Sequence, residues 1–429
     1  MKKVAFYIDN KSIADIDLTN LVDGNPGIGG TEYLIMLVST LLSKRNNDIE
    51  VKVWMTRKQK TPDGLNISIV SNLSDAIIQA EHEDFECFIL KHDADNIIRD
   101  VLRTNGNLKF YVWCHVFVCY WELDYYSRNP FVQKIVYVGR EMYDLYRDHP
   151  SFKKSTYIYN CVNFLDCKSE AIDSPFFDRD KIVTYVGSLV PYKGFHKLAE
   201  IWPVIVKAVP EVQLCVIGSG NLYNSASELG KYGFAEKAYE EYFMKYFTDE
   251  NGDIFPNVHF LGKLGVEKKD VLLKTKVGVP NPTGISETFC LSAVEMQACG
   301  ARIATLVSPG YLDTIKNGVL CKNSNDLANT IIYLLNSSSS SYMDAMNYFE
   351  KEFSVDVVLA KWELLIRGEL LNNKTKNWGY RMKWLKEILR LLYMIIPLNK
   401  ILPPLERLLL FRDRNLFKKT TYMDSNIKW

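Results

Sequence analysis

The sequence lacks the features of membrane-spanning, disulfide-rich and zinc-binding chains. No apolar run reaches the ~20 residues that a spanning helix needs. The nine cysteines are odd in number and contain no CxxC pair, which argues against a disulfide framework or zinc ribbon and fits reduced thiols. The six histidines show no HxxxH spacing. We therefore expect a cytoplasmic protein without a metal ion.

The sequence also has almost no net charge, but this balance hides an asymmetry. The 52 Lys and Arg residues oppose 51 Asp and Glu residues, for a net charge of +1. Residues 374–429 hold 13 basic and 4 acidic residues, a net of +9, so residues 1–373 carry 39 and 47, a net of −8. An acidic body argues against a nucleic-acid partner, and the basic tail needs its own explanation.

Short apolar segments alternate with helical patterns, and this rhythm runs through the chain twice. The segments Val4–Ile8 and Val51–Met55 are typical of buried strands, and the rhythm restarts at Lys181–Val186 after a polar stretch with Pro175. Such alternation predicts an α/β fold with two doubly wound Rossmann-like domains in tandem. We expect domains over 1–172 and 173–350, a crossover helix over 351–371, and a basic amphipathic tail over 372–429.

The most informative segment is NPTGISETFCLSAVEMQACG, residues 281–300. Glu287 precedes the predicted helix, and Glu295 lies about two turns into it, so their backbones are separated by roughly 9–12 Å. Free amides at the helix start form an anion site between the two carboxylates. A nucleotide diphosphate-sugar fits this layout, because carboxylates repel phosphates but accept hydrogen bonds from hydroxyl groups. The alternative is that both glutamates are solvated helix charges.

Three further features are weaker signals. Lys193 lies in the loop after the first strand of the second domain, where it can reach a diphosphate, although most lysines simply lie on the surface. The glycine-rich loop 24–31 precedes a helix, but such loops mostly make turns. His115 ends an apolar strand and can bond a sugar hydroxyl, or it can be structural.

Four landmarks in this order resemble the family 4 retaining glycosyltransferases of the GT-B fold. They are GGTE (29–32), the strand-end His115, GSLVPYKGF (187–195), and ETFCLSAVE (287–295), in which seven residues separate two glutamates. IYNCVNFLD (158–166) resembles the domain-boundary segment of that family, and FSVDVVLAKWELL (353–365) resembles its closing helix. The resemblance covers residues 1–370. The family members that it points to are of the type found in bacterial surface-polysaccharide synthesis.

The resemblance implies a metal-independent retaining transfer, with a UDP-sugar favoured as donor and no cofactor. Lys193 would neutralise the leaving diphosphate, Glu287 would hold sugar hydroxyls, and His115 would contact the transferred sugar. Gly29 and Gly30 would face the donor diphosphate.

The same resemblance implies that residues at the predicted helix bind the phosphates and the ribose of the donor. The amides of Phe289, Cys290 and Leu291 would bind the phosphates, and Glu295 would bind the ribose. The acceptor would be a saccharide or a lipid-linked sugar.

The sequence departs from the family pattern at two positions. Ser188 stands where the family usually has an arginine, so it can donate a hydrogen bond but no charge, and Arg140 is a speculative replacement. Cys290 stands where the family usually has glycine. The loss of a phosphate-binding cation leaves two alternatives open: a non-catalytic GT-B subunit that activates a partner, and a GT-B nucleotide-sugar epimerase.

The basic tail forms an amphipathic pattern of its own. Leucines and isoleucines of residues 381–396 form one stripe and basic residues the opposite face. Basic amphipathic helices suit an anionic membrane surface, so residues 378–419 predict a peripheral location on the inner face of the cell membrane. The alternative is that the stripe packs on the first domain or on a partner subunit.

Overall fold

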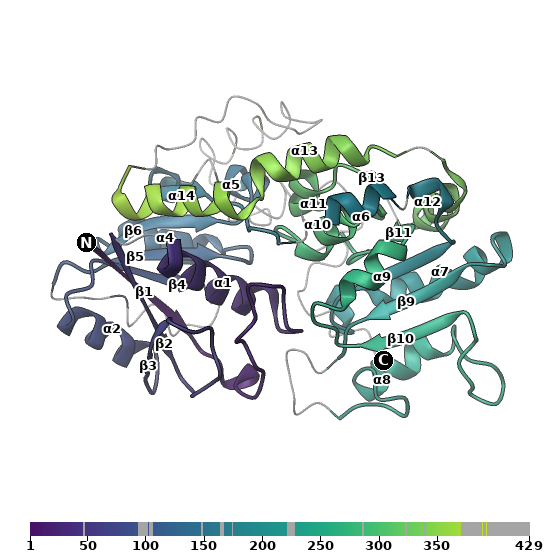
Figure 1. Ribbon diagram of the computed structural model, residues 1–429, viewed down its shortest axis with the longest axis horizontal. Coiled ribbons are helices and arrows are strands. Elements are labelled where there is room, and N and C mark those ends of the chain that lie inside the picture. The colour runs from purple at the N-terminus through teal and green to yellow at the C-terminus, as the bar shows by residue number, and fades with distance from the viewer. Residues whose placement is uncertain are drawn as a thin grey trace. The chain divides into compact units, whose positions relative to one another are not determined.

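The computed structural model describes residues 1–45, 48–92, 102, 106–146, 149–163, 167–173, 175–220, 228–284, 287–321, 324–338, 340–369, 388 and 392. The chain divides into two compact units (Figure 1). The first is built from Met1–Cys161 and from the segment that starts at Glu352, and the second from Val162–Lys351. The predicted membrane-binding tail, residues 378–419, lies outside the described residues apart from Ile388 and Leu392.

The first unit contains a parallel sheet of strand order β3-β2-β1-β4-β5-β6-β7. The strands are β1 (Lys2–Ile8), β2 (Ile49–Met55), β3 (Asn66–Ile69), β4 (Cys87–Lys91), β5 (Lys109–Cys114), β6 (Val132–Tyr137) and β7 (Ser155–Tyr157). The helices include α1 (Gly30–Arg45), α2 (Leu73–His82), α4 (Tyr120–Arg128), α5 (Arg140–Leu145) and α14 (Val355–Arg367).

The second unit repeats the pattern with the strand order β10-β9-β8-β11-β12-β13, again parallel. Its strands are β8 (Ile182–Val186), β9 (Gln213–Ile217), β10 (Val258–Gly262), β11 (Val277–Gly278), β12 (Arg302–Leu306) and β13 (Gly318–Cys321). Its helices include α6 (Lys168–Asp173), α7 (Phe195–Ala208), α8 (Lys237–Met244), α9 (Lys268–Lys274), α10 (Leu291–Ala298), α11 (Pro309–Thr314), α12 (Asn325–Asn336) and α13 (Tyr342–Glu352).

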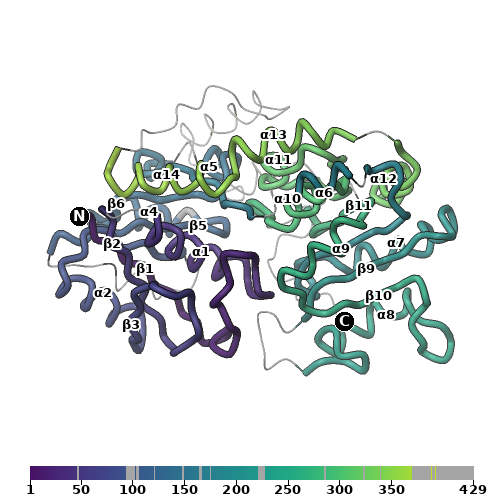
Figure 2. The backbone as a smooth tube through the Cα atoms, viewed as in Figure 1, coloured from purple at the N-terminus to yellow at the C-terminus, as the bar shows by residue number. Residues whose placement is uncertain are grey.

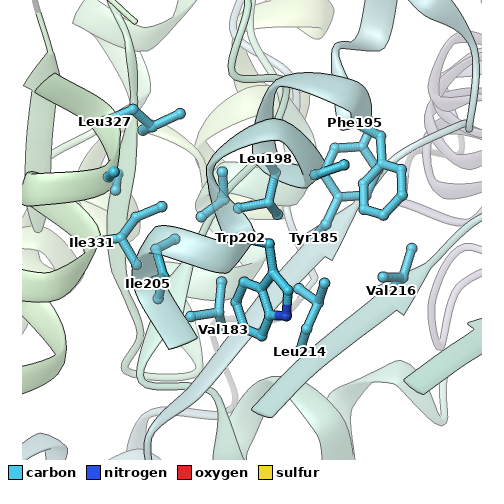
Figure 3. Packing of buried hydrophobic residues seen from close by; sticks show 14 of the residues in the cluster. Val183, Tyr185, Phe195, Leu198, Trp202, Ile205, Leu214, Val216, Leu327 and Ile331 are labelled. Carbon is cyan, nitrogen blue, oxygen red and sulfur yellow. The ribbon is translucent and has the colours of Figure 1, made fainter. Parts of the chain in front are cut away.

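The core of the second unit follows from the helical spacing of α7. Phe195, Leu198, Trp202 and Ile205 recur at intervals of three and four residues, so they share one buried face of the helix. Figure 3 shows these side chains packed toward β8 and β9, and Leu327 and Ile331 of α12 join the same cluster. This packing fixes the start of α7 next to the carboxyl end of β8.

Helix α14 belongs to the first unit although it lies far along the sequence. Figure 2 shows it, in yellow-green, beside α1 in purple (Figure 2). Arg45 at the end of α1 forms ion pairs with Asp356 and Glu363, and Trp362 packs edge-on against Trp113 of β5 at a centroid distance of 4.7 Å. The contacts explain why a helix after residue 352 returns to the sheet formed by residues 2–157.

Candidate functional site

The second unit has a point where the order of its strands reverses. The chain runs outward from β8 through β9 to β10 and then places β11 on the opposite side of β8. Val183 of β8 thus pairs with Leu214 on one side and Val277 on the other. In open α/β sheets the crevice beyond the carboxyl ends of two such strands is where ligands bind. The segments that follow β8 and β11 carry Lys193 and Glu287.

Lys193 and Glu287 form an ion pair at this strand edge. Lys193 Nζ lies 2.6 Å from Glu287 Oε1, and their side chains are 23% and 7% exposed. Asn281 Nδ2 donates to the same carboxylate oxygen at 2.8 Å. The Asn281 amide is itself held, because its Oδ1 accepts a hydrogen bond from Thr283 Oγ1 at 2.6 Å. The structure thus brings the predicted lysine and glutamate together and adds Asn281, which the sequence analysis missed.

The loop that carries Lys193 depends on a glycine. Gly194 has a φ of 71°, a region that favours glycine, and it is the N-cap of helix α7. A Cβ at this position would lie 2.3 Å from Thr283 Cγ2, so the two loops approach each other closely. On the other side of the loop, the hydroxyl of Tyr185 donates to the carbonyl of Lys193 at 3.0 Å. These contacts hold the backbone of Lys193 against β8.

The backbone from Glu287 to Phe289 rests against the start of helix α11. The amide of Gly310 and the hydroxyl of Ser308 both donate to the carbonyl of Glu287, at 3.0 Å and 2.9 Å. The hydroxyl of Thr314 donates to the carbonyl of Phe289 at 3.0 Å. A Cβ on Gly310 would lie 2.5 Å from the Phe289 nitrogen. These bonds hold the carbonyls on the α11 side and orient the segment that enters α10.

Cys290 is the N-cap of α10 and has an unusual backbone. Its φ is 71° and its ψ is 82°, and Asp84 is the one other non-glycine residue with positive φ in the part of the chain that the structure describes. Burial raises the pKa of the Cys290 thiol to about 12, and the charge of Glu287 adds to this shift. The thiol is therefore neutral at physiological pH and does not repel an anion at the amides of Cys290 and Leu291.

Glu295 makes a second lysine–glutamate pair about one turn into α10. Lys268 Nζ, from the first residue of α9, lies 2.9 Å from Glu295 Oε1, and the two side chains are 8% and 7% exposed. The sequence analysis did not single out Lys268, because it stands 27 positions from its partner and in no motif. Glu295 itself was predicted, and it is buried rather than being a solvated helix charge.

Ser188 does not extend into solvent. Its side chain is buried, and its Oγ donates to the carbonyl of Ser219 at 3.0 Å. The speculative replacement Arg140 begins helix α5 in the first unit, where its Nε lies 3.9 Å from Asp144 Oδ2. The Ser188 hydroxyl is thus committed to the backbone, and the departure from the family pattern at position 188 stands.

The remaining predicted residues lie in the first unit. Gly30 is the first residue of α1, and the carbonyl of Gly29 accepts a bond from the amide of Tyr33 at 3.0 Å. His115 directly follows β5, with its ring 4.5 Å from that of Trp113. Burial, helped by the charge of Lys91, lowers the pKa of His115 to about 3, so its imidazole is neutral at physiological pH.

Lys91 connects two elements at the strand reversal of the first unit. The sheet order places β4 beside β1, and α1 follows β1 in the chain. Lys91 at the end of β4 pairs with Glu32 in the first turn of α1 at 3.1 Å. Glu32 is the last residue of the GGTE motif, so this pair links the predicted glycine loop to the strand beside β5.

Two absences among the described residues bear on the site. No group of three or more His, Cys, Asp or Glu side chains there is arranged to hold a metal ion. No helix in the same part of the chain is both long and apolar enough to span a membrane.

Comparison with known proteins decides the class of the second unit. Residues 168–352 match the family described as Glycosyl transferases group 1. The second unit is a group 1 glycosyl transferase domain. A protein of Haemophilus influenzae, described as an uncharacterized glycosyltransferase, is 22% identical to this chain over 398 residues, which make up 85% of this chain and 99% of that protein. The chain is thus a glycosyltransferase.

Solved structures extend the similarity of this glycosyltransferase to both units. Sucrose-phosphate synthase from Thermosynechococcus elongatus superposes with a TM-score of 0.61 at 16% identity and covers 86% of this chain and 99% of its own. The Anabaena protein HepE in complex with UDP and glucose superposes with a TM-score of 0.60 at 13% identity and covers 86% of this chain and 100% of its own. These matches confirm the predicted α/β, GT-B fold.

Proposed function

We propose that this glycosyltransferase moves a sugar from a nucleotide diphosphate-sugar to an acceptor hydroxyl with retention of the anomeric configuration, as in family 4. A UDP-sugar is the favoured donor. The acceptor is a growing bacterial polysaccharide or a glycolipid. The reaction takes place in the cytoplasm, and the basic tail brings the enzyme to the inner face of the cell membrane.

One observation carries the proposal: the pair of Lys193 and Glu287 at the strand reversal of the second unit, beside the start of α10. A lysine and the amides of a helix start bind diphosphate oxygens. A carboxylate next to them accepts hydrogen bonds from sugar hydroxyls. Both groups are needed for a donor that joins a diphosphate to a sugar.

The geometry suggests what each group does during the transfer. When the donor enters, the ammonium group of Lys193 exchanges part of its contact with Glu287 for the diphosphate and stabilises the negative charge that develops there. Glu287 then accepts hydrogen bonds from the sugar. The bond between the anomeric carbon and the phosphate oxygen breaks, the acceptor oxygen bonds to that carbon on the same face, and the leaving phosphate oxygen takes the acceptor proton.

The choice of UDP rests on similarity. HepE of Anabaena was solved with UDP and glucose and also with UDP-glucose, and both structures have the fold of this chain. The ligands of these two structures support a nucleotide-sugar donor for this chain.

A donor panel tests the proposal. The purified chain is incubated with UDP-glucose, UDP-N-acetylglucosamine, GDP-mannose and ADP-glucose, and release of the nucleoside diphosphate is measured. We expect release from one of these donors, and we expect Lys193→Ala to reduce kcat by ~10²–10³-fold, the usual cost of removing one group that stabilises developing charge. Lys197→Ala is the matched control, because that lysine lies one turn further along and pairs with Glu200. Equal rates in both variants would contradict the assignment.

A non-catalytic subunit remains a second candidate because of Ser188. Its hydroxyl is committed to the carbonyl of Ser219, so position 188 provides no charge for a leaving diphosphate. A subunit of this kind would bind the nucleotide but release no product from any donor. Release by the isolated chain would exclude it, and a product that keeps the nucleotide attached to an altered sugar would instead indicate an epimerase.

A further inference from the structure

Two buried cysteines lie in contact at the C-terminal end of α10. Cys299 is the C-cap of α10, and its Sγ lies 3.4 Å from the Sγ of Cys167, which directly precedes α6. The two residues are 132 positions apart in the sequence, and both are free thiols. The sulfur atoms of a disulfide are about 2.0 Å apart, so an approach of about 1.4 Å brings these two within bonding distance.

The end of α10 that carries Cys299 is firmly held. The amide of Cys299 donates to the carbonyl of Glu295 at 3.0 Å. The hydroxyl of Tyr342, on α13, donates to the carbonyl of Ala298 at 2.9 Å. Because these bonds fix the last turn of α10, the approach of the two sulfur atoms has to come from the side of Cys167.

Helix α6, which follows Cys167, is fastened more weakly. It has six residues and buries the side chain of one of them. Ion pairs connect it to its neighbours, Lys168 to Glu350 of α13 at 2.8 Å and Glu170 to Lys269 of α9 at 2.9 Å. Glu350 and Glu170 are 44% and 51% exposed, so these pairs add little stability. Helix α6 can therefore shift by a small distance, and its local opening admits a small oxidant.

Arg179 supplies positive charge beside the two thiols. A Cβ on Gly300 would lie 2.4 Å from Arg179 Nη2, so the guanidinium packs against the backbone directly after Cys299. Its Nη1 donates to the carbonyl of Thr275 at 2.8 Å. The hydrogen bond with Cys167 and burial raise the pKa of the Cys299 thiol, while the charge of Arg179 acts in the opposite direction. The guanidinium thus stabilises the thiolate, which is the form that reacts with oxidants.

We propose that Cys167 and Cys299 close to a reversible disulfide when the protein meets hydrogen peroxide, and that this bond latches α6 to α10. The thiolate sulfur of one cysteine attacks a peroxide oxygen, the O–O bond breaks, and the leaving hydroxide takes a proton to form water. The sulfur of the second cysteine attacks the resulting sulfenic acid, and the S–S bond forms as the S–O bond breaks and releases a second water. The two thiols lose two electrons in total, and one peroxide is reduced to two water molecules. A dithiol reduces the bond again.

The latch joins two segments with different positions in the second unit. This unit begins at Val162, so Cys167 belongs to the segment by which the chain enters it. Helix α10 begins at Leu291, at the amides of the candidate site. A cross-link between residues so far apart in the sequence restricts the unfolded chain, and we therefore expect the oxidised unit to resist unfolding more than the reduced one.

Peptide mapping of the full chain tests for the bond. Reduced protein, freed of reductant, is treated with hydrogen peroxide, its remaining thiols are alkylated in denaturant, and the digest is analysed by mass spectrometry. We expect a linked peptide that contains Cys167 and Cys299 and that disappears after treatment with dithiothreitol. We also expect the thermal midpoint of the oxidised protein to rise by roughly 5 °C or more and to return on reduction.

Three serine variants locate the effect. Cys119→Ser is the matched control, because it removes an exposed thiol that reacts readily with peroxide and can link two copies of the chain. It should leave the linked peptide and the gain in midpoint unchanged. Cys167→Ser and Cys299→Ser should each abolish both. If Cys299→Ser does not fold, Cys167→Ser carries the test, since it lies on the weakly fastened side of the pair.

The possible outcomes are distinct. Recovery of Cys167 and Cys299 as alkylated thiols, after an exposure to peroxide that oxidises the half-buried Cys215, overturns the proposal. Separate sulfinic acids at the two positions without a linked peptide also overturn it. A linked peptide without a change in midpoint overturns the latch, and so does a gain in midpoint that persists in Cys167→Ser.

Discussion

The two lysine–glutamate pairs at either end of the segment 287–295 differ in their access to solvent. In the outer pair, Lys193 is 23% exposed and shares the Glu287 carboxylate with Asn281. In the inner pair, Lys268 and Glu295 are 8% and 7% exposed. The two glutamates are equally buried, at 7% exposed each, so the pairs differ only in their lysines, and Lys193 is the one that reaches solvent.

The difference in exposure suggests that the two ion pairs have different roles. A partly exposed ion pair adds little to stability but can exchange partners when a charged ligand arrives. A buried pair cannot exchange its partner without leaving a charge uncompensated. We therefore expect the outer pair to matter mainly for catalysis and the inner pair for stability and for a fixed geometry.

The largest expected effect follows from breaking the inner pair. Glu295→Ala leaves the Lys268 ammonium group without its partner in a buried place, and such changes cost about 3–5 kcal/mol of unfolding free energy. The double variant Lys268→Met/Glu295→Leu removes both charges and should recover most of that loss. Urea denaturation followed by circular dichroism measures both. A loss below about 1 kcal/mol in Glu295→Ala would mean that the pair is hydrated and unlike a buried one.

Breaking the outer pair should reduce donor turnover strongly and stability only slightly. Glu287→Gln keeps a side-chain oxygen that can accept from Asn281 and Lys193, so we expect the free energy of unfolding to change by about 1 kcal/mol or less. Donor turnover should fall by ~10²-fold, because a neutral amide holds the sugar and orients Lys193 less strongly. Steady-state kinetics and urea denaturation on the same preparation make the comparison. A variant that loses stability but keeps its rate would reverse the roles of the two pairs.

The smallest expected effect concerns Cys290, which lies between the pairs. Left-handed backbone costs a non-glycine residue roughly 1–2 kcal/mol, and glycine loses part of this gain to its greater freedom in the unfolded chain. Cys290→Gly should therefore raise the thermal midpoint slightly without reducing donor turnover. Asp84→Gly is a matched control in the first unit, with a φ of 58°, and should gain less because aspartate tolerates this conformation. A lowered midpoint in Cys290→Gly would show that the thiol packs favourably.

The sequence predicted most of the fold because buried parallel strands are near-continuous apolar runs. Val4–Ile8 and Val51–Met55 were predicted and lie within β1 and β2. The edge strands β3 and β13 were missed, since Asn66–Ile69 and Gly318–Cys321 each have four residues and are too short for a periodic signal. Helix α7 continues through Pro203, which lies on its exposed face.

The candidate site was predictable only where chemistry is concentrated in one segment. Glu287, Glu295 and the amides between them lie within nine consecutive residues, so their spacing could be interpreted directly. Lys268 and Asn281 were not predicted, because their partners are set by the packing of α9 and by the hydrogen bonds of Thr283. Tertiary packing determines the positions of Lys268 and Asn281, and it leaves no periodic pattern in the sequence.

The contact between Gly194 and Thr283 has a consequence for anyone who redesigns this enzyme. A methyl group at position 194 would lie 2.3 Å from the methyl group of Thr283, so Thr283 occupies the space that a side chain at 194 would need. A substitution at position 194 alone meets this contact, and the positive φ of 71° strains any side chain placed there. A smaller side chain at position 283 removes the contact but not this strain, so a redesign of the two loops should keep glycine at 194 and vary position 283.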